Sequence, residues 1–251
     1  MHLRDSNVRH KHFILLIETL AVVSCGPYRQ NIANVPVFRA QGEFQASGNL
    51  SFNGWEGQLA YALPHQCALL AQHNNSGLVR QEFSRTNYIL HQNYFTELGL
   101  GGYRLPSRQD RFALRGYYLL AGMGYSHYFS TGSSSNDVLD VSYHRIGVQC
   151  DFVKILRHSV ELAISPRLHV VNFYDVNDQT SRHTGIHNVT AMYSELAFTT
   201  QYQLLKYLKL KTQFVCMLPL SNLSALFESS PVNASIGLTG VIGQSKSKKP
   251  R

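Results

Sequence analysis

Residues 115–129 read RGYYLLAGMGYSHYF, and this stretch decides the fold. Apolar side chains, most of them large, occupy every second position, and small residues fill most of the positions between them. The apolar series is Tyr117, Leu119, Ala121, Met123 and Tyr125, and the other series is Leu120, Gly122, Gly124 and Ser126. Because successive side chains of a strand point to opposite faces, this period predicts a strand with one apolar face and one face of mostly small residues.

The same period of two recurs along the chain. It is clear in residues 145–152, 159–170, 195–202, 208–218 and 232–239, and weaker in residues 43–52, 56–63, 67–73 and 94–104. From residue 39 onward no stretch sustains the 3.6-residue period of a helix. The sequence therefore predicts an all-β fold of about ten antiparallel strands, with eight as the alternative.

The polar face of these strands distinguishes a membrane barrel from a soluble sandwich, which also alternates. A soluble sheet would place large apolar groups inside and many charges outside. Here the polar face mixes small residues with single charges, which suits a narrow lumen in which opposite charges pair. We expect Glu97, Glu161 and Glu195 to pair there with Arg145 and Arg167. The interpretation is an up-and-down membrane β-barrel.

Aromatic residues gather near the ends of the predicted strands, as expected for the girdles of a membrane barrel at its two water interfaces. The expected girdle residues are Tyr117, Tyr118, Tyr125, Tyr128, Phe129, Phe173 and Tyr174.

The connections alternate in length. Short turns are expected at residues 64–66, 155–157 and 205–207, and long loops at residues 74–93, 130–139, 175–190 and 219–231. Short turns on the periplasmic side and long loops outside are typical of outer-membrane barrels. Residues 53–55 are shorter, and residues 105–112 longer, than this rule predicts.

The first 24 residues have the layout of an export signal. A basic stretch with Arg4, Arg9 and Lys11 precedes an apolar core that is too short to span a membrane as a helix. The sequence that follows, Val22-Val23-Ser24-Cys25, resembles a bacterial lipobox, and the resemblance implies acylation of Cys25. The expected division is a lipoprotein signal peptide (1–24), a periplasmic linker (25–41), the barrel (42–243) and a basic tail (244–251).

Composition argues against several other classes. Only 15% of residues are charged, and the net charge of +8 is scattered apart from the basic tail, so no nucleic-acid surface is expected. The four cysteines form no C-x-x-C pair, and His183 and His187 lie in a polar loop with no evident third ligand. No phosphate-binding loop opens a helix. We expect no metal, no cofactor and no nucleic-acid partner.

Several segments together resemble small lipobox-bearing outer-membrane β-barrel proteins of Gram-negative bacteria. They are the lipobox, the Val-Pro-Val-Phe linker at residues 35–38, Gly42-Glu43 at the first strand and EGQLAYA at residues 56–62. The resemblance implies an outer-membrane location with a lipid anchor at Cys25. It supplies no shared catalytic residue.

The leading hypothesis is therefore a non-enzymatic outer-membrane barrel lipoprotein with a structural or surface-interaction role. Membrane lipid is the one expected partner, and no protein or small-molecule partner is specified.

One alternative is a lipid-modifying acyl hydrolase, because residues 124–132 loosely resemble the His/Ser motif of outer-membrane lipid A deacylases. It would use His127 and Ser130, with Asp137 or Glu161 orienting the imidazole. A bulge near Gly132 would be needed to bring the two residues to one face. A second alternative is a lipid-anchored periplasmic β-barrel that binds a small apolar ligand.

Overall fold

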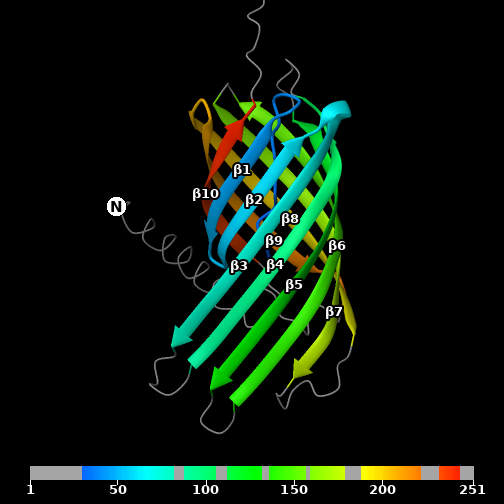
Figure 1. The fold of residues 1–251 in the computed structure, drawn as a ribbon, viewed down its shortest axis with the longest axis vertical. Helices are drawn as coiled ribbons and strands as arrows, with labels where there is room; N and C mark the ends of the chain where they lie inside the picture. Colours follow the sequence, from blue (N-terminus) through cyan, green and yellow to red (C-terminus); the bar gives the residue numbers. More distant parts are fainter. Residues whose placement is uncertain are drawn as a thin grey trace, which may run out of the picture.

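Ten strands close into one antiparallel barrel in the computed structural model (Figure 1). The structure describes residues 30–81, 88–105, 112–131, 136–156, 159–178, 188–221 and 232–243. Each strand pairs with its neighbour in sequence, and β1 closes the barrel against β10. The strands are β1 Phe44–Ser51, β2 Gly54–Ala62, β3 Cys67–Gln81, β4 Tyr88–Tyr103, β5 Ala113–Thr131, β6 Asn136–Leu156, β7 Val160–Asp178, β8 Val189–Leu205, β9 Leu208–Pro219 and β10 Val232–Ile242. The all-β barrel is confirmed, with ten strands rather than eight.

The barrel has two distinct ends. One end, called the turn end, carries the 3-10 turn Pro64–Gln66, the connection from Leu156 to Val160 and the turn at Lys206 and Tyr207. The other, called the loop end, carries the connections from Asp178 to Val189 and from Pro219 to Val232. Both expected exceptions are present, because β1 and β2 meet at the loop end in a tight turn and β4 and β5 are joined at the turn end by residues 104–112.

Two of the long loops predicted from sequence are mostly strand. β3 and β4 stay paired out to Gln81 and Tyr88, and β5 and β6 out to Thr131 and Asn136. The strands from β3 to β7 therefore project well beyond their neighbours at the loop end (Figure 1). The prediction failed because residues 74–77 (NNSG) carry no apolar period, whereas backbone hydrogen bonding continues regardless of side chain.

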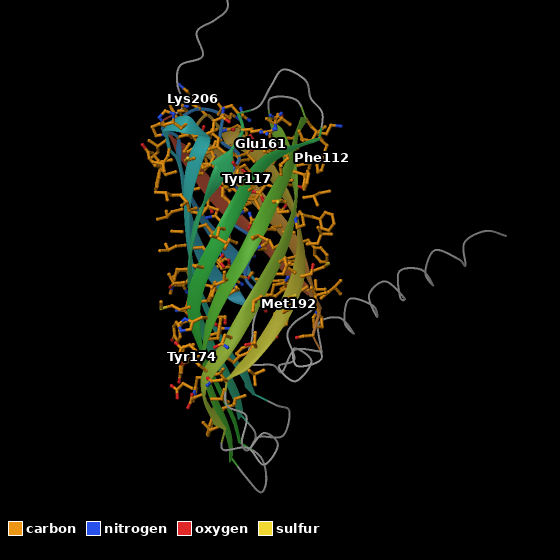
Figure 2. All side chains as sticks on the ribbon, turned by 90° about the vertical axis from the view of Figure 1, so that its right-hand side faces the viewer. Phe112, Tyr117, Glu161, Tyr174, Met192 and Lys206 are labelled. Atoms are coloured by element: carbon orange, nitrogen blue, oxygen red, sulfur yellow. The ribbon has the colours of Figure 1, made fainter. Side chains whose placement is uncertain are left out.

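The outer surface of the barrel is apolar. Leu119 and Met123 are 60% and 63% exposed, and their side chains project away from the sheet as the outward series predicted. Exposed aromatic residues lie toward both ends (Figure 2). They are Tyr61, Phe112, Tyr117, Tyr202 and Tyr207 toward the turn end, and Phe52, Trp55, Tyr94 and Tyr125 toward the loop end.

The spacing of these aromatic residues matches a membrane. Tyr117 and Tyr125 lie on the same face of β5, eight residues apart. At about 3.3 Å per residue this spacing is about 26 Å along the strand, which at a tilt of about 40° projects to about 20 Å along the barrel axis, of the same order as the apolar band of about 25 Å on outer-membrane barrels.

Two of the predicted girdle residues were placed on the wrong face. Tyr118 and Phe173 are buried inside the barrel, because each is one position out of phase with its outward neighbours Tyr117 and Tyr174. The side chain of Tyr128 lies outside the described part of the chain.

The small residues on the inner face of β5 make room for rings from the adjacent strands. A Cβ atom at Gly124 would lie 2.3 Å from Cζ of Tyr143, and one at Gly122 would lie 2.6 Å from Cζ of Phe95. These two rings stack with their centroids 5.8 Å apart. Glycine in this strand therefore allows large aromatic side chains to fill the lumen near the loop end.

Within the described ranges, no helix is long and apolar enough to cross a membrane.

Candidate functional site

The lumen of the barrel contains part of its own chain. Residues 30–38 are all buried, with Gln30 and Ala33 fully covered. They contain no regular secondary structure and contact inward-facing side chains from strands on all sides of the barrel. The expected periplasmic linker over residues 25–41 is therefore corrected: its described part, which begins at residue 30, mostly fills the lumen.

Amide side chains hold this luminal segment by its main-chain carbonyl groups. Gln149 donates to the carbonyl of Asn34 at 2.8 Å, and Gln201 donates to that of Val35 at 3.0 Å. The other amide donors are Asn53 and Asn233 to Gln30, Gln58 to Ile32, Gln213 to Ala33 and Gln45 to Val37. Lys211 also reaches the carbonyl of Ala33, at 3.4 Å.

Further contacts fix the segment in place. The amide N–H of Ile32 donates to Glu56 at 2.8 Å, and Asn34 donates to the main-chain carbonyls of Leu59 and Ala71 at 2.9 and 3.2 Å. Each such bond contributes about 1 kcal/mol net, and a buried donor left without a partner costs about 1–3 kcal/mol. The inner wall therefore satisfies most of the main-chain carbonyl groups of the luminal segment, whereas the side-chain amides of Gln30 and Asn31 are not fully hydrogen-bonded.

A charged cluster lies near the middle of the lumen. Arg145 contacts Glu97 at 2.6 Å, and Arg167 bridges Glu97 at 3.2 Å and Glu195 at 2.8 Å. All four side chains are at most 3% exposed. Arg145 also lies over the ring of Phe95, 4.1 Å from its centroid. The predicted pairing of Glu97 and Glu195 with the two arginines is confirmed.

The predicted partners of Glu161 were wrong. Glu161 pairs with Lys209 at 2.8 Å and with Arg39 at 2.6 Å near the turn end. Glu161 is the second residue of β7 and lies at the turn end, whereas Arg145 and Arg167 lie farther toward the loop end. Glu43 accepts hydrogen bonds from the backbone N–H groups of Arg39 and Ala40. These carboxylates fix the point where the chain leaves the lumen and turns into β1.

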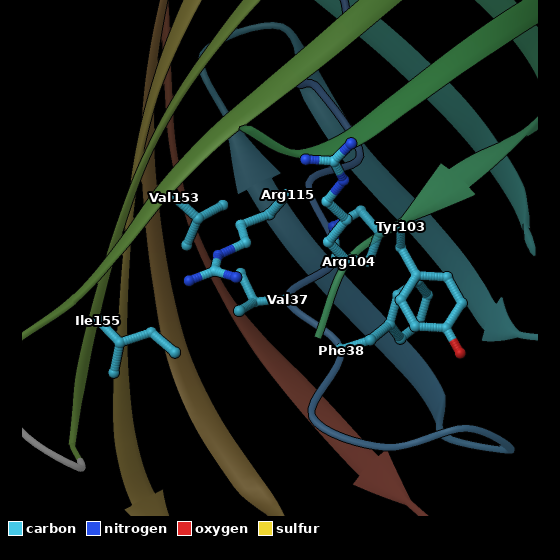
Figure 3. Close-up of a pocket in the computed structure, with 8 residues that line it drawn as sticks. Val37, Phe38, Tyr103, Arg104, Arg115, Val153 and Ile155 are labelled. Carbon is cyan, nitrogen blue, oxygen red and sulfur yellow. The ribbon is translucent and has the colours of Figure 1, made fainter. Parts of the chain in front are cut away.

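A small pocket opens beside the luminal segment near the turn end. Val37 and Phe38 line it together with Tyr103 and Arg115 (Figure 3). Phe38 packs against Tyr103 with ring centroids 4.9 Å apart, and Arg115 donates to the carbonyl of Leu105 at 2.8 Å. The aromatic pair and the arginine therefore form part of the wall of this pocket.

A histidine–carboxylate pair lies on the outer face toward the loop end. Nδ1 of His127 lies 2.6 Å from Oδ1 of Asp140, its direct cross-strand neighbour, and the hydroxyl of Tyr125 donates to the same oxygen at 2.7 Å. Asp140 thus takes the place that the hydrolase alternative gave to Asp137 or Glu161. Glu161 lies inside the lumen at the opposite end.

In the described part of β5, which ends at Thr131, there is no bulge to support the hydrolase alternative. The side chains of Ser130 and Asp137 lie outside the described part of the chain. The register of β5 with β6 runs without a shift from Gly116 to Thr131, so positions 127 and 130 belong to opposite faces of the strand.

Other predictions concern residues that the structure does not describe. The signal peptide, Cys25, the basic tail, His183 and His187 all lie outside the described residues. Among the residues that are described, no group of three or more His, Cys, Asp or Glu side chains could hold a metal ion.

The luminal segment was the main feature that sequence reasoning missed. One signal could have found it. Six inward positions in strands are buried glutamines, at residues 45, 58, 72, 149, 201 and 213, and a buried amide needs a hydrogen-bond partner. The salt bridges predicted from sequence provide no partner for most of these amides, and so many inward amides indicate a further polar chain inside the lumen.

Comparisons with known proteins find similarity only among solved structures. No protein-family model and no curated protein matches the sequence. The translocator domain of the autotransporter NalP from Neisseria meningitidis is 10% identical, with a TM-score of 0.46 over 93% of this chain and 97% of that one. CarO of Acinetobacter baumannii is 12% identical, with a TM-score of 0.32 over 82% and 97%. The NanC porin is 12% identical, with a TM-score of 0.30 over 78% and 98%.

Proposed function

We propose that this protein is an outer-membrane β-barrel lipoprotein whose lumen is closed by its own residues 30–38, and that it has a structural or surface-interaction role rather than a transport role. The buried luminal segment, bonded to amide side chains from several strands, is the observation that supports the closed state. It also argues against the apolar-ligand alternative, because the space for such a ligand is filled.

The outer surface supports membrane insertion. A ring of exposed aliphatic side chains between two sets of aromatic residues would be costly in water, and it matches the lipid-facing band of an outer-membrane barrel. In this proposal the turn end faces the periplasm and the loop end faces the cell exterior, following the lengths of the connections. The lipid anchor is the acylated Cys25.

Membrane fractionation of Cys25→Ala tests the proposal. We expect the variant to remain in the membrane fraction after carbonate extraction, because the strands span the bilayer, and to change its gel mobility on boiling. Wild-type protein is expected to incorporate labelled palmitate and Cys25→Ala to incorporate none. Release of the variant by carbonate would contradict the membrane barrel. Equal palmitate incorporation by both proteins would contradict only the anchor.

We also propose that the protein is not a hydrolase, because position 130 belongs to the opposite face of β5 from position 127. His127→Ala is therefore expected to leave the acyl composition of the outer-membrane lipid unchanged relative to wild type in the same strain, as measured by mass spectrometry. A difference in lipid acylation between the two strains would favour the hydrolase alternative, with Asp140 orienting the imidazole.

A further inference from the structure

The luminal segment has a defined direction. At the turn end Arg39 contacts Glu161, and Phe38 packs on Tyr103, the last residue of β4. At the opposite end the carbonyl of Gln30 accepts hydrogen bonds from Asn53 and Asn233, both at 3.1 Å. The chain therefore runs through the barrel from the loop end, at residue 30, to the turn end, at residue 39, before it turns back into β1.

Asn53 and Asn233 identify the level at which residue 30 lies. Asn53 lies in the tight turn between β1 and β2, and Asn233 is the second residue of β10. Both positions are at the loop end, where the short strands finish and the strands from β3 to β7 continue (Figure 1). Residue 30 thus lies at the level of the rim on the low side of the barrel.

The direction is fixed by contacts along the whole segment. Hydrogen bonds to the carbonyls of Gln30, Ile32, Ala33, Asn34, Val35 and Val37 advance in order from the loop end to the turn end. The N–H of Ile32 also meets Glu56, which faces inward two residues into β2 from the loop end. A segment that entered from the turn end and folded back could not make this ordered series.

We propose that the barrel displays the part of the chain before residue 30 on the loop side of the membrane, which is the cell exterior. The inference rests on the proposed function only for the choice of which end faces out. Cys25 lies five residues before Gln30, within about 17 Å of extended chain. Acyl groups on Cys25 would therefore enter the outer leaflet, at the cell surface, and not the periplasmic leaflet.

Labelling of single cysteines in intact cells tests this display. Tyr28→Cys is the reporter for the displayed segment. Phe52→Cys is the matched reporter for the loop end, since Phe52 is 73% exposed in the tight turn, and Lys206→Cys is the reporter for the turn end. All three are made with Cys67→Ser, because Cys67 is exposed near the turn end. The probe is a membrane-impermeant maleimide, applied before and after permeabilisation and after denaturation.

The expected result is that Tyr28→Cys and Phe52→Cys label in intact cells, whereas Lys206→Cys labels only after permeabilisation. If Tyr28→Cys needs permeabilisation or denaturation while Phe52→Cys does not, the display is wrong and the membrane orientation stands. If Lys206→Cys labels in intact cells and both other variants require permeabilisation, the proposed orientation is reversed and surface display fails with it, although the threading itself holds.

Discussion

A chain that lacks residues 30–38 is expected to conduct ions across a planar lipid bilayer, whereas the full-length protein is expected to carry no measurable current. The segment is the main-chain partner of amide side chains on several strands, and its removal leaves those polar groups to water. In the bilayer recording, the full-length protein is expected to give no current and the deletion variant to give resolvable single-channel steps.

The charges that remain on the wall predict the selectivity of the open form. Among the described residues, six acidic and four basic side chains are buried: Glu43, Glu56, Glu97, Asp151, Glu161 and Glu195 against Arg145, Arg167, Lys209 and Lys211. Arg39, which pairs with Glu161, and Arg115, which lines the lumen, offset this excess of two acidic groups, so little selectivity between cations and anions is expected. The heat-dependent gel shift of the deletion variant serves as the folding control. A folded deletion variant that carries no current would show that other residues close the lumen.

Arg167→Leu is expected to lower the free energy of unfolding by about 3–5 kcal/mol, because it leaves two buried carboxylates without their shared partner. Arg167 contacts both Glu97 and Glu195 and is 3% exposed. The measurement is the urea dependence of the gel-mobility shift, with protein refolded in detergent micelles.

Two further variants give this prediction its controls. Lys206→Ala, at an exposed turn position, is expected to change stability by no more than about 0.5 kcal/mol. Replacing Arg167 and Glu195 together, as Arg167→Leu with Glu195→Gln, is expected to restore part of the loss, because Glu97 keeps Arg145 as its partner and no uncompensated acid remains. Equal stability of Arg167→Leu and wild type would mean that water solvates the two carboxylates.

The strands and their faces could be predicted because period-two alternation is a local property. Leu119 and Met123 are outward for the same reason that Glu97 and Arg145 are inward: each continues the phase of its own strand. Pairing of inward acids and bases then follows from the need to compensate buried charge. The alternation within one strand does not specify which inward acid contacts which inward base, and so the partners predicted for Glu161 were wrong.

The luminal segment could not be predicted in the same way. Residues 35–38, Val-Pro-Val-Phe, carry no periodic signal, and a short apolar run of this kind fits a linker as well as a buried strand. Its environment is made by residues distant in sequence, such as Gln213, which is 180 residues from Ala33. The extra length of β3 and β4 at the loop end was not predicted for a related reason, because many of the residues that pair there are polar.

The seam between β1 and β10 gives the closed barrel a mechanical property. This seam is paired from Phe44 with Ile242 to Ser51 with Ser235, and it closes the ring around a segment of the same chain. The arrangement is a lasso, in which residues 30–38 are continuous with β1, the first strand of the barrel that encircles them.

Release of residues 30–38 requires either separation of β1 from β10 or passage of everything before Gln30 through the barrel. The luminal segment would therefore be retained because those events are slow, as well as by its hydrogen bonds. Acyl groups on Cys25 would add to this retention, because they are too bulky to pass through the barrel. Assembly would follow the same constraint, with the luminal segment in position before the last strand closes.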